Sequence, residues 1–322
     1  MPKSVGGGGR IRTFVDAKSA DLQSAAIDRS ATPPNLRLQH ENSLFGPPKR
    51  ARVARKSNEL RQGPIPLIQR VMSSRPPRSS RPPRGGHQSA WLYGHHAVLA
   101  ALANPERRFE RIVATKEAAE RHAGQLGGRA QILSREDMAQ RLPAGAVHQG
   151  IAALASPLEE PALEDLLARC GDQAMVLALD QVTDPHNVGA ILRSAAAFGA
   201  AGVVVTERHA PAETGVLAKA ASGALELVPL MRAVNLVRTL EQLKAEGFWI
   251  YGLDERGDTT IGKLDLGGRV CVVLGAEGEG LRRLTAEKCD RLVTIPTSNT
   301  LAALNVSNAA AVACYEWARR RL

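Results

Sequence analysis

The strongest constraint on the fold is a regular alternation of apolar runs and helical stretches between residues 174 and 322. The apolar runs that predict strands cover residues 175–179, 202–205, 225–230, 248–253, 269–274 and 291–295. Helical patterns fill most of the gaps, over residues 187–198, 214–221, 235–246 and 281–288. Strands that are mostly unbroken apolar runs are typical of a parallel sheet with helices on both faces. The sequence therefore predicts an α/β fold built on a parallel sheet.

The last predicted strand leads into a loop of small polar residues. Pro296 ends this strand because it has no backbone N–H to donate. Asn305 or Ser307 can then cap a helix over residues 309–320. Ligands of open α/β sheets lie beyond the carboxyl ends of the strands, so this loop is a candidate binding site. Taken alone, the stretch fits an ordinary strand–loop–helix connection equally well.

A second candidate loop follows the first strand of this region. Pro185 stiffens the turn, and Asn187 can cap the helix that begins there. Arg193 lies six residues later, about 240° around the helix from Asn187. By itself, this stretch is a capped helix with an arginine on its surface.

A third candidate loop is rich in glycine and follows residues 269–274. Its sequence is Gly275-Ala276-Glu277-Gly278-Glu279-Gly280. A glycine-rich turn between a strand and a helix can let a ligand approach the backbone. The spacing is not GxGxxG and the strand is a late one, which disfavours a dinucleotide-binding domain.

Residues 89–156 predict a separate, small α/β domain of about seventy residues, large enough to fold alone. Its predicted helices cover residues 97–102, 116–126 and 135–142, and its predicted strands cover residues 111–115, 130–133 and 146–154. Its histidines His95, His96 and His148 have no acidic or cysteine partner at metal-ligand spacing. Packing or loop hydrogen bonding is therefore favoured for them over metal binding. Residues 157–173 predict an acidic, proline-containing linker to the domain at 174–322.

The basic charge of the chain is concentrated in its first 86 residues. The whole chain has a net charge of +10, whereas residues 1–86 hold 17 Lys/Arg and 5 Asp/Glu. Residues 87–322 are consequently slightly acidic, so global charge does not make the folded part a nucleic-acid binder. The Gly, Pro, Arg and Ser content of residues 1–86 predicts a disordered tail, either a basic arm with nonspecific RNA affinity or a linker without a role. Residues 7–37 also resemble a transfer-RNA gene read as protein, so residues 1–71 are a candidate start-codon misassignment, with Met72 as the natural start.

Composition also bears on the compartment. No apolar run approaches the roughly 18 residues of a membrane span, and no apolar signal segment opens the sequence. The four cysteines are scattered without a CxxC pair, which argues against a zinc site and for reduced thiols. We expect a cytoplasmic protein without a bound metal.

Together, the three loops resemble the motifs of the SpoU (TrmH) family of RNA 2′-O-ribose methyltransferases, within the SPOUT superfamily. The resemblance covers about residues 174–320 and rests on the order and spacing of three motifs: Asp184-Pro185-x-Asn187-x-Gly189-x-Ile191-x-Arg193, Leu274-Gly275-x-Glu277-Gly278-x-Gly280-Leu281 and Ile295-Pro296…Leu304-Asn305-Val306-Ser307. Residues 89–156, which end in Val147-His148-Gln149-Gly150, are similar to the substrate-binding domain of the subgroup that methylates a guanosine in 23S rRNA.

This resemblance implies a SPOUT-type sheet with a C-terminal trefoil knot, S-adenosylmethionine (SAM) as cofactor, and a homodimer whose active site draws on both subunits. It implies an RNA-binding amino-terminal domain and methylation of a guanosine ribose 2′-hydroxyl in 23S rRNA. The implied catalytic positions are Asn187, Arg193, Glu277 and Asn305. The implied cofactor-binding positions are Leu274, Gly275, Gly278, Ile295, Leu304 and Ser307.

The sequence departs from the family at two positions and leaves two other functions open. Many relatives have Ser at the position of Ala303 and Gly near Asn299, and the missing hydroxyl at 303 can weaken one cofactor-loop contact. Asn readily adopts left-handed backbone angles, so the loop can survive the second change. The alternative functions are a transfer-RNA ribose methyltransferase of the same superfamily and a noncatalytic rRNA-binding assembly protein.

Overall fold

The computed structural model describes residues 89–298 and 304–321. The predicted tail at 1–86, the start-codon hypothesis for 1–71, and the departures at Asn299 and Ala303 lie outside the described residues. No described helix is both long and apolar enough to cross a membrane.

The larger sheet has seven strands in the described part of the chain, in the order β7-β6-β5-β10-β8-β11-β9. Every neighbouring pair is parallel. The strands are β5 (Ala174–Asp180), β6 (Gly202–Thr206), β7 (Leu230–Ala233), β8 (Trp249–Leu253), β9 (Thr259–Thr260), β10 (Arg269–Gly275) and β11 (Arg291–Thr294). The predicted α/β fold with a parallel sheet is confirmed.

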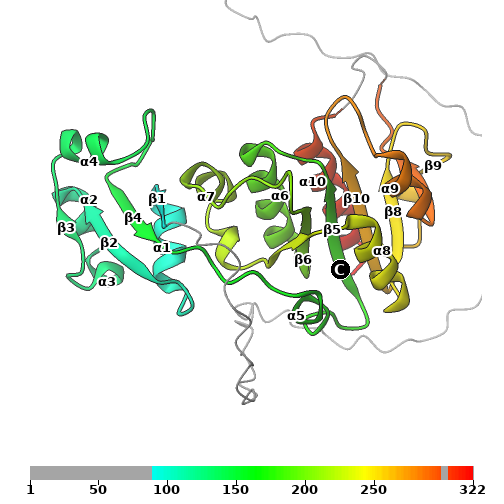
Figure 1. The fold of residues 1–322 in the computed structure, drawn as a ribbon, viewed down its shortest axis with the longest axis horizontal. Coiled ribbons are helices and arrows are strands. Elements are labelled where there is room, and N and C mark those ends of the chain that lie inside the picture. Colours follow the sequence, from blue (N-terminus) through cyan, green and yellow to red (C-terminus); the bar gives the residue numbers. More distant parts are fainter. Residues whose placement is uncertain (1–88, 299–303, 322) are drawn as a thin grey trace, which may run out of the picture. The chain divides into compact units, whose positions relative to one another are not determined.

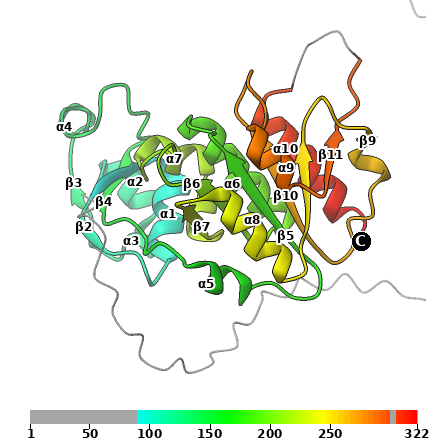
Figure 2. The ribbon, with the colours of Figure 1, turned by 45° about the vertical axis from the view of Figure 1, so that its right-hand side comes forward.

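Helices cover both faces of this sheet (Figures 1 and 2). One face packs against α6 (Pro185–Phe198), α7 (Gly215–Ala221) and α10 (Val306–Ala318), and the other packs against α8 (Leu236–Ala245) and α9 (Arg283–Lys288). The side chains of β5 alternate between two apolar cores. Leu177 and Leu179 belong to the first core and Val176 and Ala178 to the second, and all four are fully buried. Burial on both faces explains why the strand is apolar at every position.

Side-chain caps set where the helices begin. Asp184 accepts a hydrogen bond from the backbone N–H of His186 at the start of α6, with Pro185 in the first turn. Thr214, Asn235 and Asn305 cap α7, α8 and α10 in the same way. Such caps satisfy backbone donors that have no partner within the helix. Capping residues therefore mark the beginnings of α6, α7, α8 and α10, whereas α9 begins without a side-chain cap.

The strand predicted at residues 225–230 is wrong. A short 3-10 helix, η1 (Ala224–Glu226), occupies its first half, and β7 begins only at Leu230. Leu225 and Val228 are buried, so the apolar run marks a buried turn and not a strand. Gly223, at φ +91°, starts this turn. The short strand β9 was not predicted.

The small domain contains a four-stranded mixed sheet in the order β1-β4-β2-β3. Its strands are β1 (Ala90–Tyr93), β2 (Phe109–Ala114), β3 (Gln131–Ile132) and β4 (Ile151–Ala155), and its helices are α1 (His95–Ala103), α2 (Lys116–Arg121), α3 (Ala123–Leu126) and α4 (Arg135–Arg141). Strand β1 was not predicted. The strand predicted at 146–154 begins five residues late, because Gln149 and Gly150 both have positive φ and form a turn.

The segment predicted as a linker contains one short helix, α5 (Leu163–Leu167). Leu166 of this helix is fully buried and packs with Val176 and Ala178. The segment is therefore partly fixed to the larger sheet. The domain boundaries themselves remain predictions.

A buried ion network connects the small domain to the larger one. The guanidinium of Arg107, whose side chain is 1% exposed, lies 2.7 Å from the carboxylate of Glu213 and 2.6 Å from that of Glu226. It also donates to the carbonyl oxygen of Ser156 at 2.9 Å. Burial alone would lower the pKa of Arg107, but hydrogen bonds and charge interactions with the two glutamates raise it overall.

Candidate functional site

Three side chains from three distant parts of the chain meet at one point. The Nδ2 of Asn187 donates to Oε1 of Glu277 at 3.1 Å. The Nδ2 of Asn305 donates to the same oxygen at 2.6 Å and to Oδ1 of Asn187 at 3.0 Å. Three of the four predicted catalytic residues are therefore directly hydrogen-bonded to one another. We call Asn187, Glu277 and Asn305 the polar triad.

Each member of the polar triad is held by the element that carries it. Asn187 lies in the first turn of α6, just after the capped turn at Asp184. Asn305 is itself the cap of α10, and its Oδ1 accepts from the backbone N–H of Ser307 at 2.9 Å and from the hydroxyl of Ser307 at 2.5 Å. The amide orientation of Asn305 follows from these bonds, because Oδ1 faces the helix and leaves Nδ2 for Glu277. Ser307 therefore acts on the triad through Asn305.

Glu277 sits in a tight hairpin formed by residues 275–280. The backbone N–H of Gly280 donates to the carbonyl of Ala276 at 3.0 Å. A Cβ on Gly275 would lie 2.1 Å from the carbonyl carbon of Gly280, so residue 275 must be glycine for this closure. Gly278 has φ +83°, and a Cβ built there would meet nothing within 4 Å. The hairpin therefore presents bare backbone to open space, which is what a bound ligand requires of such a loop.

The remaining predicted cofactor positions lie at the end of β10, after β11 and before α10. Leu274 is buried and pairs with Leu179 and Leu253 in the neighbouring strands, so its side chain is not available to a ligand. Ile295 is half-buried directly after β11. Leu304 is 38% exposed beside the triad residue Asn305. An exposed leucine, open glycine backbone and amide groups fit a cofactor with both apolar and polar parts.

Arg193 is the predicted catalytic residue that does not join the triad. It is exposed on α6, and no hydrogen bond or ion pair links it to Asn187, Glu277 or Asn305 in the described part of the chain. Gly189 of the first motif lies on the same helix and is buried. A Cβ there would lie 2.5 Å from that of Ala220, so glycine permits the close packing of α6 on α7.

Of the three histidines for which packing or loop hydrogen bonding was predicted, His95 and His148 make side-chain hydrogen bonds. Nδ1 of His148 accepts from the backbone N–H of Gly150 at 3.1 Å, and Nδ1 of His95 lies 3.0 Å from Nε2 of His122. Burial, and then the charge of His122, lowers the pKa of His95. Among residues 89–298 and 304–321, no group of three or more His, Cys, Asp or Glu side chains is placed to hold a metal ion.

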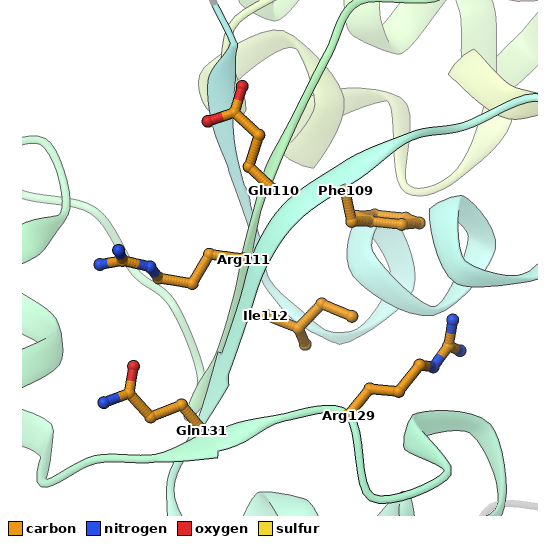
Figure 3. Close-up of a pocket in the computed structure, with 6 residues that line it drawn as sticks. All are labelled: Phe109, Glu110, Arg111, Ile112, Arg129 and Gln131. Atoms are coloured by element: carbon orange, nitrogen blue, oxygen red, sulfur yellow. The ribbon is translucent and has the colours of Figure 1, made fainter.

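A separate hollow lies on the small domain, along β2 and the segment around β3 (Figure 3). Its lining combines apolar, amide and charged side chains: Phe109, Glu110, Arg111, Ile112, Arg129 and Gln131. The guanidinium of Arg129 donates to the carbonyl oxygens of Leu126 and Gln125, whereas the exposed side chain of Arg111 extends away from the strand (Figure 3). None of these residues belongs to the polar triad.

Two further aspartates near the hairpin were not predicted as site residues. Asp180 ends β5 and Asp254 follows β8, and both side chains are almost completely buried. The available signal was a single acidic residue directly after an apolar strand, as in Leu179-Asp180 and Leu253-Asp254. Such a residue stands where parallel strands meet their ligands.

Comparisons with protein families match both parts of the chain. Residues 174–315 match the SpoU rRNA Methylase family, and residues 91–161 match the family described as RNA 2'-O ribose methyltransferase substrate binding. The family resemblance derived from the three motifs is confirmed by these matches.

Individual relatives are similar over most of the chain. The 23S rRNA (guanosine-2'-O-)-methyltransferase RlmB of Escherichia coli K12 is 40% identical over 242 residues, which cover 72% of this chain and 99% of that protein. An uncharacterized tRNA/rRNA methyltransferase, slr0955 of Synechocystis sp., is 41% identical over 242 residues, and this chain spans 62% of its length.

A solved structure supports the fold. The SpoU methyltransferase AviRb from Streptomyces viridochromogenes, in complex with the cofactor AdoMet, superposes with a TM-score of 0.62 at 22% identity. The superposition covers 73% of this chain and 91% of that one.

Proposed function

Because the chain belongs to the SpoU rRNA methylase family, we propose that it methylates a guanosine ribose 2′-hydroxyl in 23S rRNA, with SAM as the methyl donor. The E. coli relative named for this activity supports the choice, since almost its whole length aligns with this chain. The observation that carries the proposal is the polar triad, in which one hydrogen-bonded group unites residues from all three family motifs.

The residues around the hairpin are suited to hold the cofactor. SAM supplies an electrophilic methyl group bonded to a sulfonium. The backbone at Leu274, Gly275, Gly278 and Ile295 would bind its polar parts, and Leu304 would cover an apolar part. Ser307 would act through Asn305, which it holds by two hydrogen bonds. The AviRb complex with AdoMet supports this choice of cofactor for the fold.

In this proposal the polar triad joins the hairpin to two helices, and Arg193 stabilises the negative charge that develops on the ribose oxygen. Glu277 Oε1 accepts from both asparagines and lies 3.5 Å from the backbone nitrogen of Val306, so it fixes the hairpin against α6 and α10. Placing the ribose hydroxyl in line with the methyl group is the larger part of such catalysis. The Arg193 guanidinium resists deprotonation, so it stabilises the developing alkoxide and does not act as the base. The second carboxylate oxygen of Glu277, an RNA phosphate and water are the candidate proton acceptors.

A homodimer accounts for the separation of Arg193 from the triad, because the partner subunit would complete the active site. On α10, the 54% exposed Tyr315 contacts Phe198 of α6 edge to face, at 6.2 Å between ring centroids, and is a candidate contact for the partner. A C-terminal trefoil knot and a cytoplasmic location belong to the same proposal.

The small domain supplies the RNA contact in this proposal. Its match to a substrate-binding family and the hollow with Arg111, Gln131 and Phe109 support this role (Figure 3). Arginine and amide donors beside an aromatic ring suit phosphates and unstacked bases of single-stranded RNA. The proposed division is a basic tail at 1–86, with 1–71 a candidate start-codon misassignment, the RNA-binding domain at 89–156, the linker at 157–173 and the methyltransferase domain at 174–322.

A methyl-transfer assay tests the proposal. Purified protein is incubated with tritiated SAM and either unmodified 23S rRNA or unmodified transfer RNA, and the 2′-O-methylated nucleotide is mapped. We expect label at one guanosine of 23S rRNA. Label only in transfer RNA would keep the chemistry and overturn the substrate. Protein that binds SAM but labels neither RNA would favour the noncatalytic assembly role.

A further inference from the structure

Strand β10, which carries the Glu277 hairpin, lies between β5 and β8 in the sheet. Asp180 ends β5 and Asp254 directly follows β8, and both side chains are buried: that of Asp180 is 0% exposed and that of Asp254 is 4% exposed. Burying an ionised carboxylate is unfavourable unless it is paired and hydrogen-bonded. The partners of these two carboxylates therefore indicate what the aspartates hold.

Asp180 binds Arg282, which lies two residues after the end of the hairpin. Its Oδ2 accepts from the backbone N–H of Arg282 at 3.1 Å. Its Oδ1 lies 2.7 Å from Nε and 2.6 Å from Nη2 of the same arginine. Asp180 also pairs with Gly275 in the sheet register, so it contacts both the beginning and the end of the hairpin.

Asp254, which follows β8, lies beside Gly280 at the end of the hairpin. Arg256 donates to it through Nε and Nη2, each at 2.7 Å. The pKa of Asp254 is lowered chiefly by its hydrogen bond from the Arg256 side chain, with a smaller contribution from the backbone N–H of Leu281. A Cβ built on Gly280 would lie 3.5 Å from Oδ2 of Asp254. The carboxylates of Asp180 and Asp254 therefore flank the end of the hairpin from the two strands that neighbour β10.

The hairpin needs this support because its own backbone is permissive. Gly278 and Gly280 both have positive φ, and glycine restricts backbone angles less than any other residue. Glu277 lies within this permissive segment and bonds both asparagines of the triad. A shift at the exit of the hairpin would therefore move Glu277 and the backbone on either side of it.

We propose that Asp180 and Asp254 are positioning residues that hold the hairpin at 275–280 in its cofactor-binding shape, Asp180 by binding Arg282 and Asp254 by its place beside Gly280. The identity of the cofactor as SAM rests on the proposed function. In this role the two aspartates do not contact substrate or cofactor. Their loss should therefore affect cofactor affinity more than turnover.

The test compares two neighbouring arginines. Arg282→Met removes the side chain that pairs with Asp180, whereas Arg283→Met removes an exposed side chain that pairs with Glu287 on α9. We expect Arg282→Met to raise the Kd for SAM, measured calorimetrically without RNA, at least tenfold, and the KM for SAM by a similar factor. The kcat at saturating SAM should change less than threefold. Arg283→Met should leave all three values within twofold.

Hydrogen exchange of the backbone amides gives a readout that needs no ligand. In the unliganded protein, the amides of residues 276–281 should exchange at least tenfold faster in Arg282→Met than in Arg283→Met, while β5 and β10 stay protected. Equal exchange in the two variants would overturn the proposal, as would unchanged SAM affinity or a loss confined to kcat. If the wild-type chain binds no SAM, the proposed function fails, and the exchange comparison still decides the positioning role.

Discussion

Arg193 makes no hydrogen bond to the triad in the described part of the chain, so its role can be tested separately from that of the triad. We expect Arg193→Lys to lower kcat at least tenfold while the Kd for SAM stays within twofold, since lysine keeps the charge but not the planar fork of donors. Turnover is measured with tritiated SAM. Arg238→Lys, at an exposed position on α8, is the control and should be silent. Near-wild-type turnover of Arg193→Lys would refute the geometric role.

Asn305 combines two functions in one amide, and two substitutions separate them. Its oxygen caps α10 and its nitrogen donates to Glu277 at 2.6 Å. Asn305→Ala loses both, so we expect about 1 kcal/mol less stability from the lost cap as well as at least a tenfold loss of methyl transfer. Asn305→Asp keeps a good cap but places a carboxylate against Glu277. It should lose activity equally while unfolding closer to the wild type, as thermal denaturation would measure.

An equal loss of stability in both Asn305 variants would show that the triad bond, and not the cap, stabilises the helix. Full activity of Asn305→Asp would show that methyl transfer does not need the amide nitrogen of Asn305.

At the scale of an element, the hairpin at 275–280 depends on its first glycine. The Cβ of Gly275→Ala would lie 2.1 Å from the carbonyl carbon of Gly280, so the hairpin must open or the strand must shift. We expect a destabilisation of about 1–3 kcal/mol, as for other overpacking substitutions, with loss of SAM binding. Gly262→Ala is the matched control, because its Cβ would meet nothing within 4 Å and its φ is not positive. Denaturant unfolding and calorimetry of both variants check the comparison, and equal stability would contradict it.

The elements also show how far sequence patterns reach. Capping residues and unbroken apolar runs located α6, α8, β5 and β10 correctly, because those signals are local. The pattern failed at residues 225–230, where burial of Leu225 in a turn has the same apolar signature as a strand. In the site, the motifs named all three triad residues, but their mutual bonds depend on how the sheet orders its strands. Asp180 was missed because its partner Arg282 is distant in the sequence, and Asp254 because its place beside Gly280 depends on the order of the strands.

At the scale of the whole molecule, Arg107 connects the small domain to the methyltransferase domain. Arg107→Met leaves the carboxylates of Glu213 and Glu226 without their buried partner. Breaking a buried ion pair in this way typically destabilises a protein by about 3–5 kcal/mol. We expect a loss of this size in denaturant unfolding, together with weaker binding of rRNA. Arg108→Met, at the exposed neighbouring position, should change neither. An unchanged midpoint for Arg107→Met would show that the network does not couple the domains.

The separation of the triad residues along the chain fixes the earliest point during synthesis at which the triad can form. Asn187 and Asn305 are 118 residues apart, and the bond between them requires the last helix to be in place. A growing polypeptide in which the parallel sheet has begun to form still lacks one corner of the site. The triad can therefore close only after Asn305 has left the ribosome, and a chain truncated before Asn305 would lack it.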